Sequence, residues 1–188
     1  LASINADAFT TVSELTAREC LQFHKREVDE VLPNGFEDQF VPKAKEFKKK
    51  RLAAREKMLQ IASELTGDQF PEDTVLMATS GRYEFRNKGI DLFIDSLGEL
   101  NRNESCPGKA VAFILIPANH YGPHKGGKDI ERHLTHNLHY EEHDQILNRI
   151  KSNGLNNSAD DKVKVIFVPS YLNGDDGIFN LSYYDVLI

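Results

Sequence analysis

Strongly apolar segments alternate with amphipathic ones through the second half of the chain. Apolar runs cover Thr74–Thr79, Ala110–Ile116 and Val163–Val168. Short continuous runs of this kind are typical of strands that are buried on both faces of a parallel sheet. Between them, apolar residues recur at helical spacing over Ile90–Leu100 and Glu141–Lys151. The alternation predicts an α/β fold, a Rossmann-like parallel sheet with helices on both faces.

A shorter version of the same pattern occupies residues 1–35. A β-prone run at Phe9–Val12 precedes Ser13, the predicted N-cap of a helix. A short strand is predicted at Glu30–Leu32, and Pro33–Gly35 has the composition of a turn. We interpret residues 1–35 as the end of one α/β domain.

One long amphipathic helix is predicted within residues 36–71, with Pro42 in its first turn and Gly67 at its end. Its apolar stripe consists of Phe47, Ala54, Met58, Ile61, Ala62 and Leu65. Its other face is basic, a pattern that nucleic acid can bind, but without interleaved aromatic residues a solvated face is favoured. Residues 36–71 are predicted to be a helical connector, and residues 72–188 the first part of a second α/β domain.

The composition narrows the class of protein further. The 188 residues carry a formal net charge of -6, which argues against wholesale binding to nucleic acid or to an anionic membrane. No apolar run approaches the roughly 20 residues of a membrane span. Cys20 and Cys106 form no CxxC motif, which favours a reducing cytoplasmic setting. The chain starts at Leu1 without Met and ends at Ile188 without a tail-like composition, so we expect a fragment of a longer protein.

The stretch Ser80–Gly89 joins a predicted strand to a predicted helix and carries the candidate chemistry. Gly81 permits a close backbone approach, and Asn87 is a predicted N-cap whose helix start would present free N–H groups to an anion. Arg82 and Lys88 add two positive charges, so the turn is a candidate phosphate or diphosphate site. The alternative is that both cations are solvated loop residues. The turn matches neither a Walker A loop nor a G-x-G-x-x-G fingerprint.

The motif Gly81-Arg82-Tyr83-Glu84-Phe85, one variable residue, then Asn87-Lys88-Gly89 resembles the signature of animal and fungal glycogen synthases, glycosyltransferase family 3. The chain is similar to a bacterial member. Further matches in order extend the resemblance over nearly the whole chain: Pro33-Asn34-Gly35, Val111-Ala112-Phe113, Thr135-His136-Asn137, Asn157-Ser158 with Asp161, and Val163–Phe167 with Pro169. The stretch between Ala118 and Thr135 is much shorter than in animal and fungal members.

The resemblance implies a two-domain nucleotide-sugar glycosyltransferase fold, cut across its domain junction. It implies that Arg82 and Lys88 act on the diphosphate of UDP-glucose, with Gly81 and Gly89 completing the donor-phosphate site. The parent protein would transfer glucose to the non-reducing end of an α-1,4-glucan such as glycogen, with retention and with neither cofactor nor metal. We expect the fragment alone to be inactive and leave open a homo-oligomeric parent.

Several alternatives follow from the same residues. The parent could use another acceptor, such as sucrose or a lipid-linked sugar, or it could be a non-catalytic phosphate-binding domain of the same fold. UDP follows from the resemblance, whereas ADP-glucose is the usual donor of other bacterial glycogen synthases. Glu84 could serve as an acid or base, but a carboxylate between two cations is expected to stay ionised and to orient Arg82.

Six of the seven histidines fall between His120 and His143. Residues 119–129 are predicted to form a mobile loop, and a helix beyond it could gather His133, His136 and His139 on one face as a metal site. We favour separate roles for these histidines, and no metal, because the spacing fits no fixed zinc motif.

Overall fold

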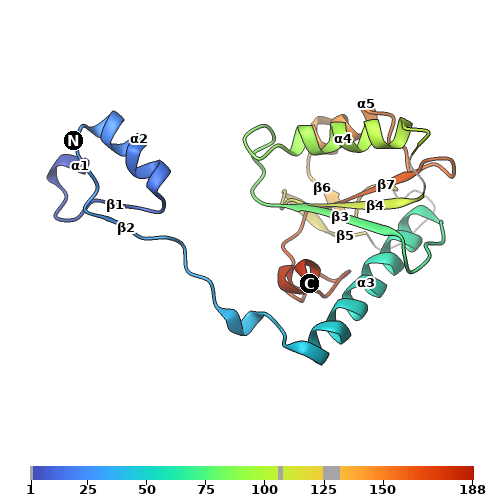
Figure 1. Cartoon of the computed structure of the whole chain (residues 1–188). Coiled ribbons are helices and arrows are strands. Elements are labelled where there is room, and N and C mark those ends of the chain that lie inside the picture. Colours follow the sequence, from blue (N-terminus) through green and yellow to red (C-terminus); the bar gives the residue numbers. More distant parts are fainter. Residues whose placement is uncertain (1, 106–107, 125–131) are drawn as a thin grey trace. The chain divides into compact units, whose positions relative to one another are not determined.

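The computed structural model describes residues 2–105, 108–124 and 132–188 (Figure 1). It forms two compact units, residues 1–40 and residues 41–188. Cys106 and residues 125–129 of the predicted loop lie outside the described residues. The assignment of residues 1–35, 36–71 and 72–188 to parts of two domains stays a prediction.

The first unit contains the short strands and the helix that the pattern predicts. Its elements are α1 (Ala2–Asn5), β1 (Thr10–Thr11), α2 (Glu14–His24), β2 (Glu30–Val31) and a 3₁₀ helix, η1 (Asp38–Phe40). The two strands pair in parallel, and the Ser13 side chain accepts a hydrogen bond from Thr16 N as the N-cap of α2. None of the described side chains of residues 2–40 is buried, so this unit has no core of its own.

The second unit contains the predicted parallel sheet. Its helices are α3 (Ala44–Thr66), α4 (Ile90–Arg102), η2 (Glu141–His143), α5 (Gln145–Ser152) and α6 (Tyr183–Leu187). Its strands are β3 (Val75–Ser80), β4 (Ala110–Leu115), β5 (His120–Pro123), β6 (His136–Leu138) and β7 (Val163–Val168). The three longer strands run parallel in the order β3-β4-β7, with Val75 opposite Ala110 and Ala110 opposite Val163. The three apolar runs are therefore confirmed as strands.

Helices cover both faces of this sheet, as predicted. Helices α4 and α5 pack on one face over Ala112, Ile114 and Phe167, while α3 packs on the other face over Val111 and Phe113 (Figure 1). Every residue of β4 and β7 is buried, and layers cover both faces of the sheet. β4 lies between the other two strands, while β7, at the end of the strand order, is flanked by residues 133–135, which hydrogen-bond to Phe167. By contrast, β3 is partly exposed along its length. No helix in the described part of the chain is long and apolar enough to cross a membrane.

Most of the apolar stripe predicted for α3 is confirmed, because Ala54, Met58, Ile61 and Ala62 are buried. Gly67 ends it in a left-handed conformation (φ +79°), as predicted. The predicted position of Pro42 is wrong, because the helix begins at Ala44 after Lys43. The basic face is mostly exposed, but Arg55 donates to the carbonyl oxygens of Glu72 and Thr74 and so fastens α3 to the start of β3.

Two helical predictions after β4 need correction. The expected helix over Glu141–Lys151 is broken into η2 and α5, because Asp144 is extended and caps α5 by accepting from Leu147 N at 2.9 Å. The expected loop at residues 119–129 begins with β5, which pairs antiparallel with β6. The helix that would have gathered the histidines does not form, since His136 lies in strand β6.

Candidate functional site

The carboxyl ends of three parallel strands meet at one edge of the sheet. Residues 81–89 follow β3, Pro117–Asn119 follow β4, and Pro169–Tyr171 follow β7. Two open cavities lie at this edge, and both are lined by Pro117–Asn119. One, of about 320 Å³, is also lined by Tyr83, Leu138, Tyr140 and Asp144. Ligands of open α/β sheets collect at this edge, so the structure supports a site here.

The loop at residues 81–89 folds back on itself before α4. Glu84 N donates to the carbonyl oxygen of Arg82 at 2.7 Å, and Lys88 N donates to that of Glu84 at 2.9 Å. Gly89 has a φ of +64°, a left-handed conformation that is costly for residues with a Cβ. The two glycines therefore bracket a tight turn, and Gly89 is needed for its conformation.

The start of α4 differs from the prediction. Gly89, not Asn87, occupies the N-cap position, and no side chain caps the helix. The N–H groups of Ile90 and Asp91 both donate to the carbonyl oxygen of Phe85, at 3.1 and 3.3 Å. The predicted set of free N–H groups facing an anion is thus wrong, because the preceding turn brings a carbonyl group to the helix start. Anion binding in this loop depends instead on its side chains.

Arg82 and Lys88 both point to solvent. The Arg82 side chain is 79% exposed, and its Nε lies 2.9 Å from Glu84 Oε1. The expectation that Glu84 orients Arg82 is confirmed by this contact, which leaves the two terminal nitrogens of the guanidinium for a ligand. Within the described residues, the Lys88 ammonium has no ion-pair or hydrogen-bond partner. The structure therefore presents two exposed cations on one turn, and of these Arg82 is paired with Glu84.

Sequence reasoning missed a side chain that ties this loop to α5. The Tyr83 hydroxyl donates to Asp144 Oδ2 at 2.8 Å and accepts from Ile146 N at 3.2 Å. Burial raises the pKa of the Tyr83 hydroxyl, and the hydrogen bond to Asp144 raises it further. Burial also raises the pKa of Asp144. The partners lie 61 positions apart in the chain, so no local pattern of the sequence links them.

The described histidines make different contacts, although the rings of His120 and His136 meet edge to face with centroids 4.6 Å apart. His133 Nε2 lies 2.8 Å from the carbonyl oxygen of Leu155, and His136 Nε2 lies 3.3 Å from that of Asp176. The ring of His139 stacks on Tyr121 with centroids 3.8 Å apart. Burial lowers the pKa of His136. No cluster of metal-ligating side chains occurs among the described residues, and the absence of a bound metal in the parent stays a prediction.

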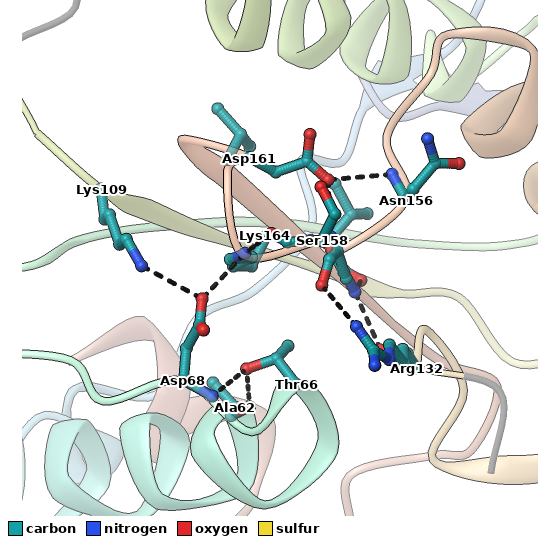
Figure 2. A network of polar contacts seen from close by, with 12 residues as sticks. Ala62, Thr66, Asp68, Lys109, Arg132, Asn156, Ser158, Asp161 and Lys164 are labelled. Carbon is teal, nitrogen blue, oxygen red and sulfur yellow. Dashed lines mark hydrogen bonds and ion pairs between the residues drawn. The ribbon is translucent and has the colours of Figure 1, made fainter. Parts of the chain in front are cut away.

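Several motif residues belong to a polar network at the opposite edge of the sheet (Figure 2). Lys164 is fully buried, and its ammonium lies 2.8 Å from Asp68, which also contacts Lys109. Lys164 donates to the carbonyl oxygen of Ser158 as well. Asp161 accepts from the backbone N–H groups of Asn156 and Ser158 at 3.2 and 2.8 Å. These residues join the amino ends of the strands and lie away from the candidate site.

Comparisons with known proteins agree on one family. A family model described as glycogen synthase matches residues 1–122 and 127–187. The glycogen [starch] synthase of Neurospora crassa is 30% identical over 98% of this chain and 36% of its own length. Isoform 1 of Saccharomyces cerevisiae is 28% identical over 97% of the chain and 36% of its own length. The liver enzyme of Rattus norvegicus is 27% identical over 95% of the chain and 34% of its own length.

The chain spans only about a third of the length of these curated relatives. The Neurospora crassa alignment extends over 252 positions, more than the 188 residues of this chain, so that relative has residues without a counterpart here. The family match is interrupted between residues 122 and 127. This interruption falls within the stretch between Ala118 and Thr135 that the motif spacing indicates is shortened.

Proposed function

We propose, from the premise that this chain belongs to the glycogen synthase family, that the whole protein transfers glucose from a nucleotide-sugar donor to a glucan acceptor. The finer parts of the proposal are UDP-glucose as donor, glycogen as acceptor and retention at the anomeric carbon. The protein would be a bacterial, cytoplasmic member of glycosyltransferase family 3, and a homo-oligomer is compatible with the proposal.

The loop at residues 81–89 is proposed to hold the donor diphosphate. Negative charge develops on the departing nucleoside diphosphate as the glycosidic bond breaks, and cations already aimed at it lower the barrier without reorganisation. Arg82 would bind two phosphate oxygens with its terminal nitrogens while Glu84 holds Nε, and Lys88 would act as a mobile point charge. Gly81 and Gly89 would give the turn its shape. In this proposal the transfer of glucose uses no metal ion.

One observation carries the proposal. The two cations that the family motif marks as donor-phosphate ligands lie on one turn, exposed, at the carboxyl edge of a parallel sheet. The ion pair with Glu84 holds one side of the Arg82 guanidinium, and the left-handed Gly89 closes the turn. These features support the proposal that the turn binds an anion.

The proposed domain roles follow from the pattern and the family. Residues 1–35 would close an N-terminal Rossmann-like domain, residues 36–71 would connect the domains, and residues 72–188 would begin the nucleotide-sugar-binding domain. Because the chain spans about a third of its relatives, the 188 residues alone are expected to show no transfer.

The test is glucose incorporation by the whole protein, with UDP-glucose and ADP-glucose offered side by side. Glycogen is the expected acceptor, and sucrose is the comparison acceptor. Incorporation into glycogen from UDP-glucose supports the proposal, and a preference for ADP-glucose corrects only the donor. Transfer to sucrose alone changes the acceptor. No transfer from either donor by a folded protein overturns the proposed reaction and favours a non-catalytic phosphate-binding domain.

A further inference from the structure

Tyr83 connects the loop at residues 81–89 to a second element. Its ring packs against the apolar core under α4 and α5, and its hydroxyl reaches the start of α5. In the described part of the chain, the other polar side-chain contact made by the residues of this loop is the internal pair of Arg82 and Glu84. The position of the loop therefore depends on Tyr83 more than on the two charged residues beside it.

The hydroxyl of Tyr83 has two partners that hold it in one orientation. It donates to Asp144 Oδ2 at 2.8 Å and accepts from Ile146 N at 3.2 Å. The other carboxylate oxygen of Asp144 accepts from Leu147 N at 2.9 Å, so Asp144 is itself fixed as the N-cap of α5. A hydrogen bond to a carboxylate is stronger than one between neutral groups. The result is a clasp between the loop after β3 and the helix before β7.

We propose that Tyr83 is a positioning residue for donor binding, through the clasp of its hydroxyl on Asp144 and Ile146. The proposal rests on the proposed function, in which Arg82 binds the donor diphosphate. Tyr83 can position Arg82 because the two residues are adjacent in the chain. The carbonyl oxygen of Arg82 also accepts from Glu84 N at 2.7 Å, so the backbone on both sides of Tyr83 is held. Fixing Tyr83 thereby limits where the Arg82 guanidinium can lie before the donor arrives.

The clasp is expected to raise the fraction of time for which the loop at residues 81–89 is correctly placed to bind the donor. If the loop is correctly placed for only a fraction of the time, the apparent dissociation constant of the donor rises by the inverse of that fraction. Removing the hydroxyl is expected to lower that fraction to about a tenth, given the usual strength of a hydrogen bond to a charged group. Once the donor is bound, Arg82 and Lys88 are in place, so turnover at saturation is largely retained.

The test uses Tyr83→Phe in the whole protein, which keeps the buried ring and removes only the hydroxyl. We expect the KM for UDP-glucose to rise about tenfold, with kcat within about twofold of wild type and the KM for glycogen unchanged. Tyr121→Phe is the matched control, because that side chain is 75% exposed and lies outside both cavities. The control is expected to leave all three constants unchanged.

Asp144→Asn combined with Tyr83→Phe gives a second readout. If both side chains act through one clasp, the double variant raises the KM for the donor no further than the larger single effect. A loss of activity that follows the fraction of folded protein, with the donor KM unchanged, overturns the proposal. So does a Tyr83→Phe protein with wild-type constants. An inactive wild-type protein overturns the proposed reaction instead. The activity of the wild-type protein therefore distinguishes a failure of the proposed reaction from a failure of the positioning role of Tyr83.

Discussion

The ammonium group of Lys164 lies 2.8 Å from Asp68 and is completely shielded from water. This pair joins β7 to the segment between α3 and β3, at the edge of the sheet opposite the candidate site (Figure 2). A buried ammonium must be paired, since an isolated charge in the protein interior is strongly destabilising. The contrast with Arg82 and Lys88, which point to solvent, separates the cations that hold the fold from those available to a ligand.

Lys164→Met is therefore expected to destabilise the chain. The methionine fills a similar volume but leaves Asp68 with Lys109 as its remaining partner, at 3.2 Å. We expect the free energy of unfolding to fall by about 2 kcal/mol, within the usual range for an unmade buried hydrogen bond. Urea-induced unfolding measures this loss. Lys49→Met, on the exposed face of α3, is the control and should change the stability by no more than about 0.5 kcal/mol. Equal stability of Lys164→Met and wild type would refute the structural role of Lys164.

The lowered pKa of Asp161 predicts how the free energy of unfolding depends on pH. Burial would raise the pKa of Asp161, but hydrogen bonds from Asn101 and Ser158 lower it below its ordinary value of 3.8. A lowered pKa means that the folded state favours the carboxylate, so this contribution is present above about pH 4 and is lost as the pH falls further. Asp161→Asn should lower stability at pH 7 and flatten its decline on acidification. Asp160→Asn changes an exposed neighbour and should preserve the wild-type slope. An unchanged slope in Asp161→Asn would contradict the account.

Gly98 marks a close contact between α4 and the end of α5. A Cβ at this position would lie 2.6 Å from Asn153 Oδ1 and 3.0 Å from Asn153 Cβ. Alanine favours a helix by about 1 kcal/mol over glycine, but the overlap should outweigh this gain and cost roughly 1–3 kcal/mol. Thermal unfolding of Gly98→Ala is expected at a lower temperature than wild type. Ser96→Ala, on the exposed side of α4, serves as the control. A stabilised Gly98→Ala protein would show that Asn153 moves aside freely.

The parallel sheet could be predicted because each of its strands is a local apolar run. The run at Val163–Val168 contains Lys164, whose partner Asp68 lies 96 positions earlier in the chain. A pattern of apolar positions places the strand, but it does not show which distant carboxylate meets a buried ammonium. The antiparallel pair of β5 and β6 escaped prediction for a related reason, since its Gly- and His-rich residues lack an alternating pattern.

The contacts of the candidate site are also of two kinds, those within one turn and those between segments far apart in the chain. Arg82, Lys88 and the contact with Glu84 are local features of one turn and were predicted from it. The start of α4 was not, because the carbonyl oxygen of Phe85 accepts from Ile90 and Asp91 in place of an external anion. The hydrogen bond from Tyr83 to Asp144 joins residues 61 positions apart, so it could be identified only from the folded structure. Contacts within a turn can be read from its residues, whereas contacts between turns depend on how the strands are ordered.

The central claim is that Arg82 and Lys88 hold the donor diphosphate, and kcat for glucose transfer in the whole protein tests it most directly. Lys88→Ala and Arg82→Ala should each lower kcat by about 10²–10³, the usual effect of losing a group that stabilises a developing negative charge. Arg86→Ala is the matched control, because it removes an exposed cation from the same turn, at the variable position of the motif. It should leave kcat within about threefold of wild type. A wild-type kcat in Lys88→Ala or Arg82→Ala, or an equal loss in Arg86→Ala, would contradict the account.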